Sequence, residues 1–245
     1  MSKIKGQSGF TLIELVAVII IVGILAAIAA QKIGSVAENI KAEETMREMD
    51  LIAKAVVGNE LLYNNGMRSD FGYVGDIGAF PPNLDALISN PGLGTWNGPY
   101  IKNSFEQISS DYKQDSWQAN YTLSGIQITS SGSGSNIVKY FSGSVDEILY
   151  NSIEGNIFDL DGTPPGDSLN AFILVRMTFP DGTGSYSTIS RTPDNGGHFQ
   201  FDSIPIGNHT LEIIYTPSSD TLRHYVSVSP GSALYEQNSL TTNEW

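Results

Sequence analysis

The hydrophobic pattern divides the chain into one long helical segment and a longer segment of short strands. Residues 10–30 are almost continuously apolar, and Thr11 and Glu14 are the strongly polar exceptions. Such a run, about 21 residues, can span a bilayer as a helix. Apolar residues then recur at three- and four-residue spacing, which predicts an amphipathic continuation of the helix. They are Ile33, Val36, Ile40, Met49, Ile52 and Val56.

We predict a single helix over residues 10–63. No proline lies within this range, and Asn64-Asn65-Gly66 favours a left-handed cap at its end. At 1.5 Å per residue, roughly 54 residues give a length of about 80 Å. Residues 10–30 would form a transmembrane segment or filament core, and the later apolar stripe would pack against a globular head.

Two globular regions are expected after the helix. Residues 64–129 contain turns and short apolar runs that predict a small head. Residues 143–245 contain regularly spaced strand-like runs separated by turn signals such as Asp161-Gly162 and Asp181-Gly182, a pattern typical of a β-sandwich. The runs are Ile148–Phe158, Ala171–Phe179, Tyr186–Ser190, His198–Phe201, His209–Tyr215 and Leu222–Ser229. The predicted fold class is therefore α+β, in which an all-β sandwich with a C-terminal tail follows the helix and the small head.

A glycine-serine segment separates these two regions. Residues 130–136 read Ser-Ser-Gly-Ser-Gly-Ser-Asn, a composition typical of a flexible linker. We therefore predict a linker over residues 130–142.

Charge and cysteine content exclude some function classes. Among 245 residues there are 13 basic and 26 acidic side chains, giving a formal net charge of −13. This balance argues against a general nucleic-acid-binding surface, which needs a basic stripe. The chain contains no cysteine, so neither disulfides nor thiol chemistry are available.

The start of the chain carries a specific motif. Lys3 and Lys5 lie in a short leader, residues 1–9, that ends in Gly9 immediately before the apolar run. The positive charges favour a cytoplasmic leader and export of the rest. An acid inside an apolar span is costly, so Glu14 needs an explanation. The motif reads Gly9-Phe10-Thr11-Leu12-Ile13-Glu14-Leu15-Val16.

This motif resembles the class III signal of type IV pilins and pseudopilins. The resemblance implies that a prepilin peptidase cleaves between Gly9 and Phe10 and that Phe10 is then N-methylated. It also implies that Glu14 acts in subunit assembly. An ordinary secretory signal, cleaved after Ala27 or Ala30, and a simple membrane anchor are the alternatives. Neither explains Glu14 or the Gly9-Phe10 junction.

The predicted head resembles the major pseudopilin of type II secretion. The matching pieces are Ala79-Phe80-Pro81-Pro82-Asn83-Leu84-Asp85-Ala86-Leu87-Ile88, Asn97-Gly98-Pro99-Tyr100-Ile101-Lys102 and Gln114-Asp115-Ser116-Trp117-Gln118-Ala119-Asn120-Tyr121. Ser116 stands where that family has proline and Gln118 where it has glycine, and residues 67–78 look like an insertion. The resemblance implies a possible calcium site after the last piece. However, the corresponding loop, residues 130–136, contains no acid, and calcium sites normally include carboxylates. We therefore expect no cofactor.

The predicted sandwich resembles carboxypeptidase regulatory-like, transthyretin-like modules. The matching pieces are Ile153-Glu154-Gly155-Asn156-Ile157, Asp161-Gly162-Thr163-Pro164, Gly197-His198-Phe199-Gln200-Phe201 and Ile204-Pro205-Ile206-Gly207-Asn208-His209-Thr210-Leu211. This resemblance concerns the fold and leaves the ligand of such a module open.

The remaining candidate chemistry favours structural interpretations. His198, His209 and His224 are the only histidines, and without cysteine or a close histidine pair they do not predict a zinc site. Asp159 and Asp161 flank a predicted β-turn and lack the other ligands of a calcium loop. The aromatic residues Trp96, Trp117, Tyr100 and Tyr121 are expected in the head core rather than in a ligand site. We predict no catalytic or metal-binding residues and expect that the chain is not an enzyme.

Three functions remain open. The first is a structural subunit of a type IV pilus or a type II secretion-like pseudopilus. The second is a minor or adhesive pilin that displays a binding β-sandwich, and the third is a membrane-anchored binding module that never polymerises. The expected location is the bacterial inner membrane, with a single span and a periplasmic head, and then a periplasmic or cell-surface filament after assembly. The expected partners are like subunits, the prepilin peptidase and the inner-membrane assembly machinery, with no nucleic acid.

Overall fold

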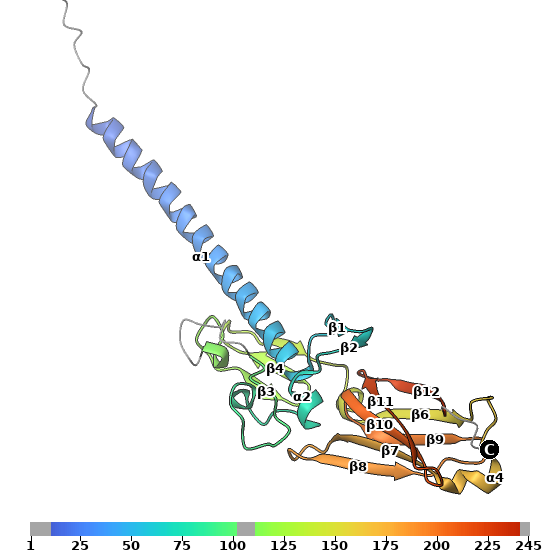
Figure 1. The fold of residues 1–245 in the computed structure, drawn as a ribbon. Coiled ribbons are helices and arrows are strands. Elements are labelled where there is room, and N and C mark those ends of the chain that lie inside the picture. The colour runs from blue at the N-terminus through green and yellow to red at the C-terminus, as the bar shows by residue number, and fades with distance from the viewer. Residues whose placement is uncertain (1–10, 102–110, 241–245) are drawn as a thin grey trace, which may run out of the picture.

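The computed structural model describes residues 11–101 and 111–240, and it has the predicted α+β architecture. A long helix, α1, projects from a globular region that contains a small head and a β-sandwich (Figure 1). The head surrounds the C-terminal part of α1, and the sandwich lies beyond the head, away from the N-terminal end of the helix. The leader, including Gly9, and Phe10 lie outside the described residues.

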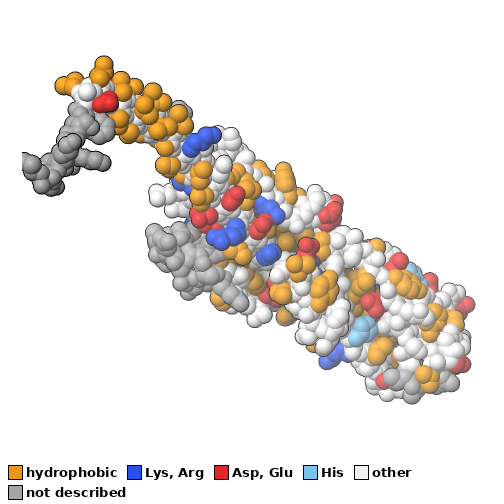
Figure 2. All heavy atoms as spheres, turned by 90° about the horizontal axis from the view of Figure 1, so that it is seen from above, with side chains coloured by type: hydrophobic (Ala, Val, Ile, Leu, Met, Phe, Trp, Pro, Cys, Tyr) orange, Lys and Arg blue, Asp and Glu red, His pale blue; other side chains and the backbone are white. Residues whose placement is uncertain are grey.

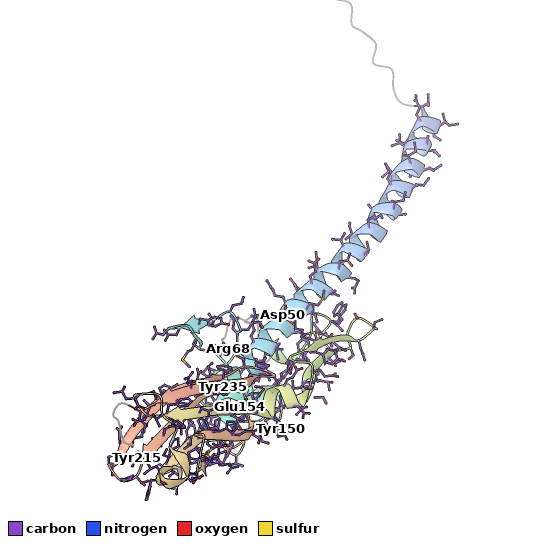
Figure 3. All side chains as sticks on the ribbon, turned by 90° about the vertical axis from the view of Figure 1, so that its right-hand side faces the viewer. Asp50, Arg68, Tyr150, Glu154, Tyr215 and Tyr235 are labelled. Carbon is purple, nitrogen blue, oxygen red and sulfur yellow. The ribbon has the colours of Figure 1, made fainter. Side chains whose placement is uncertain are left out.

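Helix α1 spans Leu12–Val57 and ends earlier than residue 63, where the sequence predicted its end. Gly58 caps it with a φ of 81°, and its N–H donates to the Lys54 carbonyl at 2.8 Å. Only glycine fits there, because a Cβ on Gly58 would lie 2.2 Å from the Asp70 carbonyl oxygen. Arg68 also caps the end by donating to the Val57 carbonyl at 2.6 Å, and Figure 3 shows Arg68 beside the last turns of α1.

The predicted cap at Asn64-Asn65-Gly66 forms a hairpin turn instead. It joins β1 (Tyr63–Asn64) to β2 (Met67–Arg68), and Asn65 and Gly66 have φ values of 52° and 81°. Positive φ at both central residues is the geometry of a tight hairpin turn. The Asn-Gly pair therefore correctly predicted a left-handed backbone conformation. The prediction that this pair ends helix α1 was wrong, because it forms the turn of a hairpin.

The head packs on the second half of α1. Met49, Ile52 and Val56 are fully buried, as the apolar stripe predicted, whereas Ile33 and Val36 remain exposed. The head core also receives side chains from α2 (Gly72–Ile77), from η1 (Leu84–Leu87) and from a sheet in the order β3-β4-β5. These strands span Thr122–Ser124, Gln127–Ser130 and Ile137–Tyr140, and η3 (Asp111–Lys113) precedes them.

Much of the segment predicted as a linker, residues 130–142, belongs to this head. Ser130 is buried at the end of β4, and Ile137–Tyr140 forms β5, which pairs with β4. Lys139 on β5 forms an ion pair with Asp50 of α1 at 2.6 Å. The glycine-serine composition therefore describes only the β4–β5 turn, and pairing with β4 orders the residues that follow it.

The sandwich consists of a four-stranded and a three-stranded sheet. The first has the order β11-β10-β7-β8 and the second the order β12-β6-β9. The strands are β6 (Asn151–Phe158), β7 (Ile173–Pro180), β8 (Tyr186–Arg191), β9 (His198–Ile204), β10 (Gly207–Tyr215), β11 (Asp220–Val228) and β12 (Ala233–Ser239). Short helices α3 (Val145–Leu149), α4 (Gly166–Leu169) and η4 (Asn170–Phe172) lie before and after β6.

Strand β12 occupies the region that the sequence predicted as a C-terminal tail. It pairs in parallel with β6, and a Cβ on Gly155 of β6 would lie 2.1 Å from the Glu236 carbonyl oxygen. The glycine therefore permits the close approach of β12. As an outer strand, β12 has mostly exposed or half-buried side chains, so its sequence lacks the apolar alternation that marks the other strands.

The head and the sandwich are joined by direct contacts. The Gly182 N–H donates to the Ile77 carbonyl at 2.7 Å, and the Thr95 N–H donates to the Gly184 carbonyl at 3.1 Å. These bonds connect the β7–β8 turn to the head. Ile148 and Ile206, from the predicted sandwich region, are fully buried in the head core. The joint is therefore a packed interface rather than a free linker.

Candidate functional site

The N-terminal end of α1 carries Glu14 in a capping box. The Thr11 N–H and the Thr11 hydroxyl each donate to Glu14 Oε2 at 2.9 Å, and the Glu14 N–H donates to Thr11 Oγ1 at 3.4 Å. These bonds satisfy donors that the first turn of a helix leaves free. Within a single chain, Glu14 therefore has a local role in capping α1, in addition to the assembly role expected from the sequence.

The helix following Glu14 presents an uncovered apolar surface. Every described side chain over residues 12–40 is exposed, and Figure 2 shows hydrophobic side chains gathered over this part of the molecule. By length and composition, α1 is the one helix among the described residues that could cross a membrane. An apolar surface of this extent is unfavourable in water, so it requires lipid or other apolar helices around it.

A cleft separates the head from the outer face of the four-stranded sheet. Its volume is about 580 Å³, and its floor contains Thr178 of β7 and Thr210 of β10. Residues of the predicted insertion form the facing wall, including Asp76 of α2. Two exposed tyrosines, Tyr186 and Tyr225, complete the lining. The sequence did not identify this cleft, because its residues come from five separate segments without a shared motif.

Asp76 is one of two half-buried acids in this cleft, together with Asp70. Its Oδ2 accepts a hydrogen bond from the Tyr100 hydroxyl at 2.8 Å, and that hydroxyl accepts one from the Asn97 N–H at 3.1 Å. Burial raises the pKa of Asp76, and the hydrogen bond from Tyr100 partly opposes this shift. Burial also raises the pKa of Tyr100, so its hydroxyl remains a donor at neutral pH.

His209 borders the cleft from the interior. Its Nε2 lies 2.6 Å from the Pro205 carbonyl, which can only accept, so Nε2 carries the hydrogen. Nδ1 is buried and has no hydrogen-bond partner among the described residues. Burial lowers the pKa of His209 to about 4, against the smaller opposing effect of the Pro205 carbonyl. The ring is therefore neutral at physiological pH.

The loop for which the sequence resemblance implied a possible calcium site, residues 130–136, is held by Asp115. Asp115 Oδ1 accepts from the N–H groups of Trp117 and Ala119, both at 2.9 Å. Its Oδ2 accepts from the Ser130 hydroxyl at 2.6 Å and from the Gly132 N–H at 3.0 Å. Both oxygens of this buried carboxylate thus hold the loop directly. The donor set does not fit calcium, since residues 130–136 supply no acid and Asp115 is fully engaged.

The three histidines and the turn residues Asp159 and Asp161 do not come together in a metal site. His198, His209 and His224 lie on β9, β10 and β11, and no group of three or more histidines and acids in the described parts of the chain could hold a metal ion. Asp159 and Asp161 belong to a turn, in which the Gly162 N–H donates to the Asp159 carbonyl and the Thr163 N–H to Asp161 Oδ1, both at 3.0 Å.

The four aromatic candidates mostly have structural contacts. Trp96 Nε1 donates to the Ala86 carbonyl at 2.8 Å, and the Tyr121 hydroxyl donates to Glu48 Oε2 at 2.7 Å. Trp117 Nε1 donates to Glu38 Oε2 at 2.6 Å, which connects the head to the exposed part of α1. Tyr100 differs, because its ring packs against Trp96 in the head while its hydroxyl binds Asp76 in the cleft.

The sequence profile of the prokaryotic N-terminal methylation motif matches residues 4–30. This match supports pilin-type processing at the N-terminus, and together with the apolar half of α1 it fits a single-pass membrane anchor. No curated protein matches the chain.

Two solved structures resemble part of the chain at low similarity. The first is the dioxygenase domain of a dioxygenase carbohydrate-binding protein fusion from the cellulolytic bacterium Streptomyces sp. SirexAA-E. It is 12% identical with a TM-score of 0.29, and the match covers 41% of this chain and 85% of that one. The second is a putative carbohydrate binding protein from Pseudomonas aeruginosa. It is 12% identical with a TM-score of 0.26, and the match covers 38% of this chain and 90% of that one. These similarities are too low to assign a fold or a ligand.

Proposed function

We propose that the chain is a structural subunit of a type IV pilus or a type II secretion-like pseudopilus, with no enzymatic activity. The observation that carries this proposal is the methylation motif at residues 4–30, which leads directly into a helix with an uncovered apolar surface. A membrane would cover that apolar surface before assembly, and the helices of neighbouring subunits would cover it in a filament. The heads would then lie on the outside of the filament.

Processing is the first step of the proposal. A prepilin peptidase in the inner membrane would cleave between Gly9 and Phe10, and Phe10 would be N-methylated. Mass spectrometry of the mature protein should therefore find residue 10 as the methylated amino terminus. An intact Met1, or a start after Ala27 or Ala30, would instead indicate a simple anchor or an ordinary secretory signal.

Assembly is the second step, and Glu14 is its proposed determinant. A carboxylate inside the bilayer is costly, by at least about 2–3 kcal/mol, unless it meets a cation or a proton. The new amino group of Phe10 in a neighbouring subunit is the proposed partner. This pairing would set the axial stagger, which helix packing alone specifies poorly.

Three variants separate this assembly role from the capping box. Glu14→Leu removes both the charge and the bonds to Thr11, whereas Glu14→Gln removes the charge and keeps an acceptor for Thr11. We expect both variants to be inserted and cleaved normally but to form few filaments, with Glu14→Asp intermediate. The measurement is a filament count by electron microscopy, with membrane level and processing checked by immunoblot. Normal filament yield from Glu14→Gln would leave capping as the role of this residue.

A second candidate function is a minor or adhesive pilin. The cleft favours it, because its polar and aromatic lining residues all belong to the globular region and none to the N-terminal half of α1. Quantitative mass spectrometry of purified filaments distinguishes the two, since a structural subunit dominates the filament and an adhesive subunit is rare in it. Absence of peptidase processing would instead support the third function, a membrane-anchored binding module that never polymerises.

A further inference from the structure

The cleft floor is a polar face built by strand register. On β10, Leu211 and Ile213 point into the sandwich core, so Asn208 and Thr210 occupy the opposite face. Thr210 is paired with Tyr225 of β11 on one side and with Thr178 of β7 on the other. The side chains on this outer face are therefore hydroxyls, an amide and an aromatic ring.

Two tyrosine rings flank this floor from opposite edges of the sheet. Tyr225 lies on β11 and Tyr186 on β8, the first and last strands of the order β11-β10-β7-β8. Three strand spacings, about 14 Å, separate them across the sheet, and Tyr186 pairs with Pro180, two residues beyond Thr178 along it. Their side chains are 68% and 67% exposed, so their faces are accessible to a ligand. Exposed tyrosines carry a flat apolar face and a polar hydroxyl, the combination that suits a ring-shaped polar ligand.

The wall formed by the head supplies fixed hydrogen-bonding groups. Tyr100 occupies Oδ2 of Asp76, and Oδ1 of this residue has no hydrogen-bond partner in the described part of the chain. Asn208, which also lines the cleft, donates from Nδ2 to the Arg68 carbonyl at 3.1 Å, and this bond orients the Asn208 side chain. These groups are held by the packed joint between head and sandwich, so they are preorganised for binding.

Charge restricts the ligand class. The cleft lining contains Asp70 and Asp76 but no lysine or arginine. An anionic ligand would meet two acids without a compensating cation. A strongly apolar ligand would leave the threonine, asparagine and aspartate groups without partners, which is costly for polar groups. A neutral ligand rich in hydroxyl groups meets both conditions.

We propose that this cleft binds a neutral saccharide. Tyr186 and Tyr225 would stack on the apolar faces of sugar rings, while Asp76, Asn208 and Thr210 would exchange hydrogen bonds with hydroxyl groups. The distance between the tyrosines fits a short oligosaccharide rather than one sugar. The inference deepens the adhesive alternative, and its biological use rests on display of the cleft by a filament, although binding itself requires no assembly.

The test measures binding to the unassembled full chain. The protein is purified in a zwitterionic detergent without a sugar headgroup and titrated by calorimetry with cellotetraose, chitotetraose and mannotetraose. We expect saturable binding to at least one of these oligosaccharides. Tyr186→Ala and Tyr225→Ala should each weaken binding about tenfold, and Asp76→Asn should weaken it similarly. Tyr140→Ala, which removes an exposed tyrosine outside the cleft, is the matched control and should bind normally.

Three results would overturn the proposal. They are the absence of binding to all three sugars at millimolar concentration, binding that the two tyrosine variants leave unchanged, and binding of a lysine-rich peptide instead of the sugars. Thermal melting of each variant verifies folding, and both tyrosines are exposed enough for alanine to be tolerated. Filament counts from the tyrosine variants should be normal. A wild-type chain that binds a sugar but forms no filaments would contradict the assembly function alone.

Discussion

At the scale of single residues, His209 makes stability depend on pH. Its pKa is lowered from 6.5 to about 4 by burial, so the folded protein holds this ring neutral while the unfolded chain protonates it. The unfolded state therefore binds more protons between these values. The free energy of unfolding should fall as the pH decreases from about 6.5 to about 4, by a total on the order of 3 kcal/mol. Urea unfolding of the detergent-solubilised protein across this range measures the slope.

Two variants identify His209 as the source of this slope. His209→Gln can still donate to the Pro205 carbonyl but does not titrate, so its stability should vary less over the same range. Asp76 acts in the opposite direction, because its raised pKa favours the folded state as the pH falls. Asp76→Asn should therefore steepen the slope, and a flat wild-type profile would contradict this account.

Gln118 is a residue held in an unfavourable backbone conformation. Its φ is 68°, in the left-handed region that favours glycine. A residue with a Cβ loses about 1–2 kcal/mol there, while glycine loses about 0.5–1 kcal/mol of backbone entropy. Gln118→Gly should therefore stabilise the protein by up to about 1 kcal/mol. Ala119→Gly, at the next position and without a positive φ, should destabilise it, and melting curves compare the two.

The residues that could be predicted were those with a local signature. Met49, Ile52 and Val56 follow helical spacing and are buried as expected, and the neighbours of Gly9 carry a motif that can be recognised in the sequence. Asp76 and Tyr186 could not be found this way. They are 110 positions apart in the sequence, and only the docking of the head on the sandwich brings them to one cleft.

At the scale of elements, Asp115 fixes the β4–β5 turn of the head. Four donors converge on its two buried oxygens, and hydrogen bonds to an ionised group are stronger than neutral ones. Asp115→Asn replaces one oxygen by an amide that cannot accept from the Gly132 N–H. We expect a loss of about 2–4 kcal/mol in the free energy of unfolding. Asp167→Asn, at an exposed acid of α4, should change stability by less than about 0.5 kcal/mol.

The effect of calcium on stability can be tested at the same turn. If Asp115 holds the turn without a metal, addition of a chelator should leave the melting temperature of the wild type unchanged. Gly132→Ala should destabilise the protein in the same direction as Asp115→Asn, because the new Cβ would lie 2.5 and 2.6 Å from the Asp115 carboxylate oxygens. A melting temperature that drops on chelation and recovers with added calcium would show that ligands other than these residues hold a metal.

Elements were predictable where their own side chains define them. The strands β6, β7, β8, β9, β10 and β11 all overlap the apolar runs found in the sequence. The end of α1, strand β5 and strand β12 depend on contacts with other segments: Asp70 against Gly58, β4 against β5, and β6 against β12. A pattern of apolar positions contains no information about such pairings when the side chains remain largely exposed.

At the scale of the whole molecule, the head and the sandwich have separate cores but share a joint. The sandwich core contains Ile153, Ile157, Phe201 and Leu211 and is distinct from the core that α1 enters. Ile148 and Ile206 belong to the predicted sandwich region but are buried among head residues. Hence a fragment of residues 143–245 keeps its own core when separated from the head but exposes these two isoleucines.

The fragment should fold, and two substitutions reveal what the joint contributes. Residues 143–245 should be soluble and melt cooperatively, at a lower temperature than the same sandwich in the full chain, because burial of Ile148 and Ile206 against the head is lost.

Ile148→Ala should cost about 2–5 kcal/mol in the full chain, where the side chain is fully buried, and less than about 1 kcal/mol in the fragment, where it is already solvated. Ile157→Ala, inside the sandwich core, is the control and should cost about 2–5 kcal/mol in both. Equal costs of Ile148→Ala in the two proteins would show that the sandwich alone buries this side chain. An unfolded fragment beside a folded full chain would show that head and sandwich form one cooperative unit. In that case the groups of the cleft would be held by a single folding unit, and loss of the joint would abolish the cleft together with the fold.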